Sequence, residues 1–388
     1  MKNFNKMVAK KYFLLLFVCM IFQSSDNRRI SNYSLDDVPI IIDVNTMRKS
    51  PLTVNPLKMK NLRYVTLETT DECLIGNADK VLISNNRIYV ADFHKTMTLF
   101  IFDLNGKFIS KIAKRGQGPG EYISFNDFDI YHNENVYIFD SHGRKILTYN
   151  SAGEYLKEIK LKYYLLNFCI IDEKMYWSPI YNNGIIFANL AVYDVGTGKT
   201  NLLFTEKKFL YDMDLMHFSS YKFYKSSNTT YYTPKFSEII YSITNNGISP
   251  AIGIKNLQKP PEYVIEKWSK EQDDAEKYKS IMSGPYFYEN LHIYETDNYI
   301  SIRCIMGANY TLLYNKQTKE TDAVRAWDIF DTIGVSEIRG CTEKEFFSVI
   351  NYFNPENIHH KKILETRPEL ADYKEDDNPV LVFFGLDM

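Results

Sequence analysis

The chain has few cysteines, and this shortage excludes two classes of protein. Its 388 residues include five cysteines and no CxxC pair, so neither a zinc ribbon nor a dense disulfide framework is indicated. Beyond Cys19, the cysteines are expected to be small buried residues in strands, with their disulfide state left open. These four are Cys73, Cys169, Cys304 and Cys341.

An excess of charge of one sign is also missing. The chain carries 46 basic and 48 acidic residues, a formal net charge of −2, and it contains no long run of like charge. Nucleic-acid binding depends on a basic surface, so nucleic acid is not an expected partner. Contact with a membrane is expected only through the N-terminal segment.

Linear signatures of catalysis are absent too. The seven histidines show neither zinc spacing with cysteine nor an HExxH motif, and no GxSxG elbow marks a serine hydrolase. We therefore assign no catalytic residue, no metal ligand and no cofactor from the sequence. Calcium stays open, because scattered carboxylates and carbonyls can bind it without a linear signature.

A ten-residue apolar run, Phe13 to Phe22, follows four lysines near the N-terminus. This length suits the apolar core of a signal peptide and is too short to cross a bilayer as a helix. Residues 1–24 are therefore predicted to be a signal peptide or a lipoprotein signal or anchor. Cys19, within LFVC, is the candidate for lipidation, although Val18 stands where a small residue is usual. The alternatives are cleaved soluble export and an uncleaved anchor.

What the chain does contain is an internal repeat. Residues 87–113 recur in outline at 135–161, where Tyr89 and Asp92 match Tyr137 and Asp140 at a spacing of 48. A repeat of about fifty residues made of strand-like pieces indicates a β-propeller, in which each repeat is one four-stranded blade.

One marker counts the blades: an apolar run with an aromatic near its end, followed in most cases by a turn rich in Asn, Gly or Thr. It occurs six times, at 99–103, 146–150, 190–194, 239–243, 311–315 and 380–384. The first five copies lead into another strand-like segment, and the sixth does not. The unpaired segment Leu62–Leu67 is predicted to complete the last blade. The sequence thus predicts an all-β fold, a six-bladed β-propeller closed by its N-terminal strand.

The propeller is expected to occupy residues 61–388, after a tether at 25–60 in which Pro39–Ile42 is one candidate strand. A short helical insertion is predicted near 265–283. It is centred on Trp268–Met282, where apolar residues recur near helical spacing, with Ser269 as N-cap. A seventh blade hidden in 255–290 is the alternative.

A second insertion, Asn354–Asn378, contains two prolines and an acidic stretch. We expect it to be a loop with one helical turn. Insertions at blade tips are where a propeller carries what distinguishes it.

The sharpest local motif is KRGQGPGEY at Lys114–Tyr122. It lacks the GK[ST] of a phosphate loop, and its GxGxG spacing before a strand does not match a dinucleotide-binding fold. We predict a tight crossover between blades, in which Glu121 pairs with Lys114 or Arg115. The alternative is a ligand-contacting loop, whose residues would be Gly116, Gly118, Gly120, Glu121 and Tyr122.

Asp92 and Asp140 follow Tyr-x-x in corresponding repeats. Repeated acids in a propeller commonly accept hydrogen bonds from backbone N–H groups of turns, and we predict this role for both. Lining a central channel is the alternative.

GQGPGEY, preceded by LNGKFISKIAKRG, resembles the six-bladed, NHL-like propeller family that is common among exported proteins of gut anaerobic bacteria. The DNPVLVFF near the C-terminus is similar to the usual end of that family. The resemblance covers residues 61–388 and implies the fold and export. It implies no catalytic residues, because the family has no well-settled biochemical role.

These patterns predict an exported, monomeric protein, either periplasmic or tethered to the outer membrane as a lipoprotein. We expect a binding or scaffold module for a carbohydrate, a peptide or an envelope protein. One alternative is a propeller enzyme of lyase or lactonase type with a metal at the channel mouth. Another is a structural envelope component whose channel is packed shut by apolar side chains. The side chains that line the channel distinguish these hypotheses.

Overall fold

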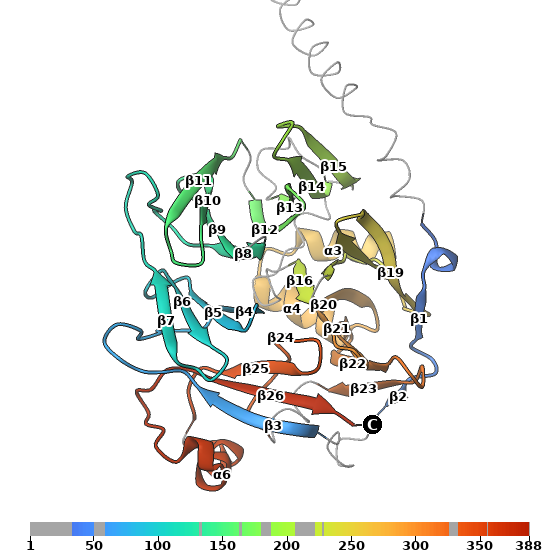
Figure 1. The fold of residues 1–388 in the computed structure, drawn as a ribbon. Helices are drawn as coiled ribbons and strands as arrows, with labels where there is room; N and C mark the ends of the chain where they lie inside the picture. The colour runs from blue at the N-terminus through green and yellow to red at the C-terminus, as the bar shows by residue number, and fades with distance from the viewer. Residues whose placement is uncertain are drawn as a thin grey trace, which may run out of the picture.

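Six β-sheets radiate from a central axis in the computed structural model of the protein (Figure 1). The structure describes residues 33–49, 59–131, 134–162, 165–179, 188–205, 222–226, 229–325, 333–354 and 356–387. Each sheet has a core of four antiparallel strands, ordered outward from the axis. The predicted six-bladed β-propeller is confirmed.

The first three blades follow the chain without interruption. Blade 1 contains β4 (Lys80–Ser84), β5 (Arg87–Asp92), β6 (Thr98–Asp103) and β7 (Phe108–Ile112). Blade 2 contains β8 (Asp127–Tyr131), β9 (Asn135–Asp140), β10 (Lys145–Tyr149) and β11 (Tyr155–Lys160). Blade 3 contains β12 (Leu165–Ile171), β13 (Lys174–Pro179), β14 (Ala188–Asp194) and β15 (Thr200–Thr205).

The other three blades come from the second half of the chain, and the last of them also includes β3 from the N-terminal part. Blade 4 contains β16 (Phe223–Ser226), β17 (Thr229–Tyr232), β18 (Ile239–Thr244) and β19 (Gly247–Lys255). Blade 5 contains β20 (Phe287–Glu295), β21 (Tyr299–Met306), β22 (Asn309–Asn315) and β23 (Thr321–Arg325). Blade 6 contains β24 (Gly340–Cys341), β25 (Phe346–Ile350), β26 (Val380–Leu386) and β3 (Met59–Thr66).

Middle strands are apolar on both faces because every blade packs between two neighbours. In β6 each residue from Thr98 to Phe102 is buried, and in β26 the whole strand is buried. Most outer strands instead carry charge: β11, for example, has the sequence YLKEIK and is largely exposed. Charged residues on an outer strand discourage pairing with another chain.

Closure of the ring follows the predicted scheme. The N-terminal β3 runs antiparallel to β26, so that Leu381 lies opposite Val65 and Val382 opposite Tyr64. In Figure 1 the two strands lie side by side, one from each end of the chain. The guanidinium of Arg63 also lies 3.8 Å from the ring centre of Phe383. The segment predicted to complete the last blade does so, and its strand begins at Met59.

Two further strands come from the segment 25–60. β1 (Ile40–Asp43) pairs in parallel with β19, and β2 (Arg48–Lys49) pairs in parallel with β23. The candidate strand at Pro39–Ile42 is therefore confirmed from Ile40 onward. A short 3-10 helix, η1 (Leu35–Asp37), precedes it. Part of the expected tether thus adds a fifth strand to blades 4 and 5.

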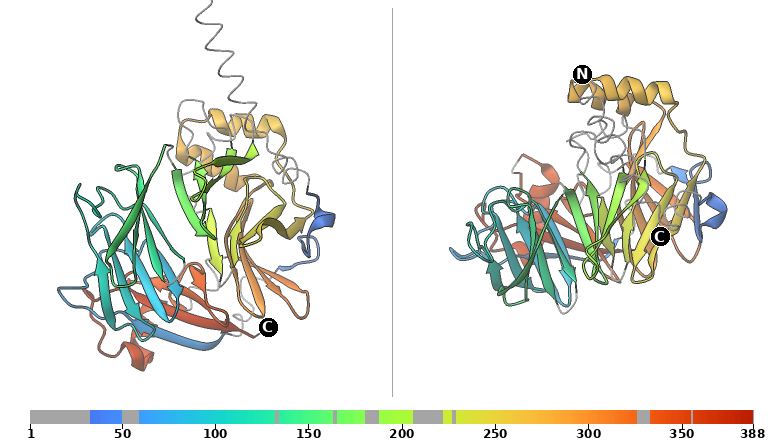
Figure 2. Two further views of the ribbon diagram at one scale, coloured as in Figure 1. Left: turned by 45° about the horizontal axis from the view of Figure 1, so that its top comes forward. Right: turned by 90° about the horizontal axis from the view of Figure 1, so that it is seen from above.

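The helical insertion lies between blades 4 and 5, but it is two helices and not one. α3 (Glu262–Lys270) and α4 (Asp274–Ser283) are separated by a break, because Asp273 caps the second helix by accepting hydrogen bonds from the N–H groups of Ala275 and Glu276. The predicted N-cap at Ser269 is wrong, since this residue lies inside α3. Figure 2 shows the pair, in gold, rising from one face of the ring.

The second insertion is more helical than expected. It holds α6 (Ile358–Thr366), capped by the side chain of Asn357, and the 3-10 helix η4 (Pro368–Leu370). Ile363 and Leu370 are buried against blade 6 and its neighbours, and these anchors account for the extra order. In the part of the chain that the structure describes, no helix is long and apolar enough to cross a bilayer.

The four cysteines beyond Cys19 are buried and free. Burial raises the pKa of the Cys341 thiol to about 11, so this thiol stays protonated and unreactive at neutral pH. The expectation of small buried residues is confirmed for all four. Cys19 lies outside the described residues.

Replacing Leu381 by alanine should lower the free energy of unfolding by about 2–5 kcal/mol, because a buried leucine lost from a packed core leaves a cavity. Leu381 is fully buried at the seam where β26 meets β3. Urea unfolding followed by tryptophan fluorescence measures the change. The matched variant Leu156→Ala, on the exposed face of β11, should cost less than about 1 kcal/mol. Equal losses would contradict a packed seam.

Candidate ligand site in the central channel

The glycine-rich segment Lys114–Tyr122 forms the crossover from blade 1 to blade 2, and its polar groups are bonded within the fold. The Gly116 N–H donates to the Tyr122 carbonyl at 3.0 Å, and the Tyr122 N–H donates to the Lys114 carbonyl at 2.9 Å. The Tyr122 hydroxyl is buried and donates to the carbonyls of Met97 and Ile112. These contacts are those of a tight structural crossover.

Gly120 is required at its position by its backbone conformation and by close packing. Gly120 has φ +73°, and a Cβ there would lie 2.7 Å from the ring of Tyr155. A Cβ on Gly116 would lie 2.0 Å from a carboxylate oxygen of Glu121. That carboxylate accepts from the Gly118 N–H at 2.8 Å, and in the described part of the chain no ion pair joins it to Lys114 or Arg115. The predicted pairing is therefore wrong, while the alternative of a ligand-contacting loop stays a prediction.

Asp92 and Asp140 have the predicted role. Asp92 accepts from the N–H groups of Gly76 and Lys95, at 2.9 and 2.8 Å. Asp140 accepts from those of Ser124 and Gly143, at 3.0 and 2.9 Å. In each blade the acid ties the incoming crossover to the turn after the second strand. The two repeats therefore share a buried aspartate that is hydrogen-bonded to the backbone of its own blade.

A pocket of about 90 Å³ lies on the propeller axis, a size that accommodates several water molecules or one small polar ligand. Residues from β4, β16, β20 and β24 line it, together with two side chains of β25. Because these strands belong to four different blades, the pocket lies in the central channel. The wall is polar as well as aromatic, so the channel is not closed by apolar side chains alone.

Ion pairs connect the inner strands across the channel. Lys80 on β4 lies 2.7 Å from Asp127 on β8. Lys225 on β16 lies 2.9 Å from Asp129, which is also on β8. Blade 2 is thereby joined both to blade 1 and to blade 4. A further pair, Lys222 with Glu289, joins blade 4 to blade 5.

The acids of these pairs are buried and hydrogen-bonded within the protein, whereas the side chains of the bases are more exposed to solvent. Asp127 and Asp129 also accept hydrogen bonds from the N–H groups of Phe168 and Ile170 on β12, at 3.1 and 2.8 Å. Their side chains are 1% and 5% exposed, while the side chain of Lys225 is 25% exposed. Burial raises the pKa of Asp127, and the ammonium of Lys80 opposes that shift.

A second charged cluster surrounds Glu337, just before β24. Its carboxylate lies 2.6 Å from Arg303 and 3.1 Å from Arg339, and 3.9 Å from Nδ1 of His292. Burial opposes ionisation of Glu337, yet the neighbouring bases outweigh it and lower the pKa of this carboxyl. Arg339 is the most accessible member, with a side chain that is 34% exposed.

His292 occupies an unusual position on β20. Its φ is +47°, and the strand shifts register between Leu291 and Tyr294. Such bulges re-aim a side chain, and a residue in this sparsely populated region often marks a functional site. The imidazole lines the pocket, with its ring centre 5.7 Å from that of Tyr224 and 6.3 Å from that of Tyr294.

The protonation of His292 follows from its neighbours. Nδ1 faces two acceptors, the Ile338 carbonyl at 3.4 Å and the Glu337 carboxylate, so the neutral ring carries its proton there. Nε2 then presents a lone pair, and it has no hydrogen-bond partner among the described residues. Burial lowers the pKa of His292 to about 4, with Arg303 and Arg339 acting in the same direction.

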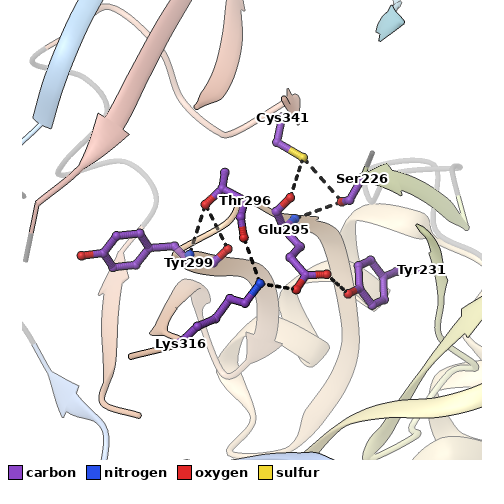
Figure 3. A network of polar contacts seen from close by, with 7 residues as sticks. All are labelled: Ser226, Tyr231, Glu295, Thr296, Tyr299, Lys316 and Cys341. Atoms are coloured by element: carbon purple, nitrogen blue, oxygen red, sulfur yellow. Dashed lines mark hydrogen bonds and ion pairs between the residues drawn. The ribbon is translucent and has the colours of Figure 1, made fainter. Parts of the chain in front are cut away.

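Beside the pocket, Glu295 holds three blades together, as Figure 3 shows. Its carboxylate accepts from the Tyr231 hydroxyl of blade 4 and from Lys316 of blade 5, the latter at 2.7 Å. The Cys341 thiol of blade 6 donates to the Glu295 carbonyl at 3.3 Å. Burial and the adjacent carboxylate raise the pKa of Tyr231, which keeps its hydroxyl a donor.

Within the described ranges, no group of three or more His, Cys, Asp or Glu side chains is arranged to hold a metal ion. Such a group at one end of the channel is what the lyase or lactonase alternative requires. His132 and His217 lie outside the described residues.

Sequence reasoning missed the channel residues. Their clearest signal was DFDIY at 127–131, where two acids at a spacing of two interrupt an apolar strand and so share one face. No comparable signal marks Lys225, His292 or Arg339. Their meeting depends on the order of the blades around the axis.

Six radial sheets around a polar axial pocket define the protein as a six-bladed β-propeller with a candidate ligand site in its channel. The chain belongs to the family of the domain of unknown function DUF4934, whose model matches residues 39–385. No curated protein matches the sequence.

Two solved structures of Bacteroides proteins are similar to this chain. A protein of Bacteroides fragilis that is described as exported has a TM-score of 0.72 at 19% identity, over 90% of this chain and 100% of that one. A member of the DUF4221 family from Bacteroides vulgatus has a TM-score of 0.51 at 11% identity, over 86% and 98% of the two chains. At these identities the likeness shows the fold. It confirms the predicted resemblance to six-bladed propellers of exported proteins.

Acidification should destabilise the protein through His292. Its pKa is about 4 when folded and about 6.5 when unfolded, so the unfolded state takes up a proton first as the pH falls. The stability that the neutral ring provides is present above pH ~6.5 and is lost toward pH ~4. We expect a loss of about 2 kcal/mol between pH 7 and pH 5 from this group.

Urea titrations at the two pH values measure this difference. His292→Gln should remove this part of the pH dependence, whereas His94→Gln, at an exposed histidine, should retain it. An unchanged pH dependence in His292→Gln would show that His292 titrates normally.

Proposed function

We propose that this protein is an exported binding module whose ligand, a carbohydrate, occupies the pocket on the propeller axis. The observation that carries the proposal is the pairing of aromatic rings with a hydrogen-bonding histidine in that pocket. Tyr224 and Tyr294 flank His292, and all three line the cavity. Sugar rings are bound in proteins by aromatic faces together with a few well-placed polar groups.

The rigidity of the site supports the same proposal. β4, β16, β20 and β24 are innermost strands, each backed by at least three further strands of its blade, and ion pairs hold β4 and β16 to β8. A preorganised site loses little conformational entropy when a small ligand binds.

A carbohydrate role predicts that Tyr224→Leu weakens binding to glycans by about tenfold, because an aromatic side chain is lost from the pocket wall. A glycan array followed by titration calorimetry of the purified full chain measures this effect. Tyr352→Leu is the matched control, since Tyr352 is exposed in the second insertion. If no glycan binds, or if both variants bind as the parent does, the proposal fails.

We also propose that the mature protein is a lipoprotein anchored through Cys19, in the periplasm or on the outer membrane. The support is the sequence: lysines, an apolar run and LFVC in the order of an export signal. Similarity to an exported Bacteroides protein agrees with export. The lipid would hold the propeller near the membrane surface.

Lipidation of Cys19 predicts that Cys19→Ser releases the protein from the membrane fraction and abolishes incorporation of labelled fatty acid. Cellular fractionation and metabolic labelling measure both effects. Cys73→Ser is the control, because Cys73 is buried in the propeller. Retention of label in Cys19→Ser would contradict the anchor.

A further inference from the structure

The exposed polar atoms of the axial pocket are not balanced between donors and acceptors. Lys80, Lys225 and Arg339 line it as bases, and Asp79 is the one acid among the lining residues that the structure describes. Each base is ion-paired with an acid that is not itself among the lining residues: Lys80 with Asp127, Lys225 with Asp129, and Arg339 with Glu337. The charged groups that line the pocket are therefore mainly bases, each held in place by an ion pair.

Lys225 and Arg339 are the two bases best placed to meet a ligand. Their side chains are 25% and 34% exposed, whereas those of their partners Asp129 and Glu337 are 5% and 19% exposed. Lys225 lies on β16, and Arg339 comes just before β24. The two strands are in contact, since Sγ of Cys341 lies 3.5 Å from Oγ of Ser226. The two bases thus enter one pocket from neighbouring walls.

His292 supplies the complementary acceptor. Its Nε2 is buried and has no partner among the described residues, although a buried polar atom without a hydrogen bond is costly. A ligand hydroxyl that donates to this atom would remove that cost. The pocket therefore offers basic groups to an acidic ligand group on one wall and an acceptor to a ligand hydroxyl at His292.

We infer that the ligand is an acidic monosaccharide unit, a sugar ring that carries a carboxylate. Its carboxylate is bound by Lys225 and Arg339, and one of its hydroxyls donates to Nε2 of His292. The ring lies against Tyr224 and Tyr294. This inference rests on the proposed carbohydrate function and specifies the chemical class of the sugar.

Glucuronate and glucose test the inference as a matched pair, because they differ only in a carboxylate and a hydroxymethyl group. In titration calorimetry of the full chain, glucuronate should bind at least about tenfold more tightly than glucose. Raising the salt concentration should weaken glucuronate binding and leave glucose binding unchanged.

Arg339→Gln should reduce glucuronate affinity to that of glucose, and thermal unfolding should verify that the variant is folded. Arg63→Gln is the control, an arginine on the outermost strand of the same blade. His292→Asn should weaken both sugars, since each donates a hydroxyl to that position.

The outcomes distinguish the acidic class of sugar from the broader carbohydrate function. Equal affinity for glucose and glucuronate, both lost in Tyr224→Leu, would overturn the acidic class and leave the carbohydrate function standing. Glucuronate binding that survives Arg339→Gln would place the carboxylate elsewhere and overturn the inference. Absence of binding by either sugar up to tens of millimolar would overturn the inference, and the glycan array then decides the broader function.

Discussion

Pairing of β3 with β26 is the constraint on which the rest of the structure depends. The two strands come from opposite ends of the described chain and meet along most of their length. Every other blade is made from a continuous stretch of sequence, with β1 and β2 added at the outside of two of them. The ring is therefore covalently open and closed only by this noncovalent seam. All inner strands keep their places because the seam holds the sixth blade between the first and the fifth.

The channel shows what this closed ring makes available. Residues more than a hundred positions apart in sequence, such as Asp129 and His292, face the same axis because the blades bring their first strands together. Ion pairs between blades 2 and 4, and the Glu295 network among blades 4, 5 and 6, then fix these strands relative to one another. Buried charges of this kind contribute little net stability, since desolvation offsets their attraction.

The blade count and the closure could be read from the sequence because both depend on local patterns. Third strands repeat an apolar run before a turn, and Gly106 and Gly153, in the turns after two of these strands, both have positive φ. Asp92 and Asp140 were predictable for the same reason, since each bonds to groups near it in the fold. The break between α3 and α4 was not foreseen, because the capping carboxylate of Asp273 competed with continuous helical periodicity. The pocket could not be predicted from the sequence, because the environment of His292 is formed by Glu337 and Tyr224, which belong to other blades.

The two short strands that precede β3 have a mechanical consequence. β1 pairs with the outside of blade 4 and β2 with the outside of blade 5 before the chain reaches the seam. A pull that arrives from the N-terminus loads those two pairings first, in shear along parallel strands. The seam between β3 and β26 and the axial pocket therefore bear no tension until those two pairings separate.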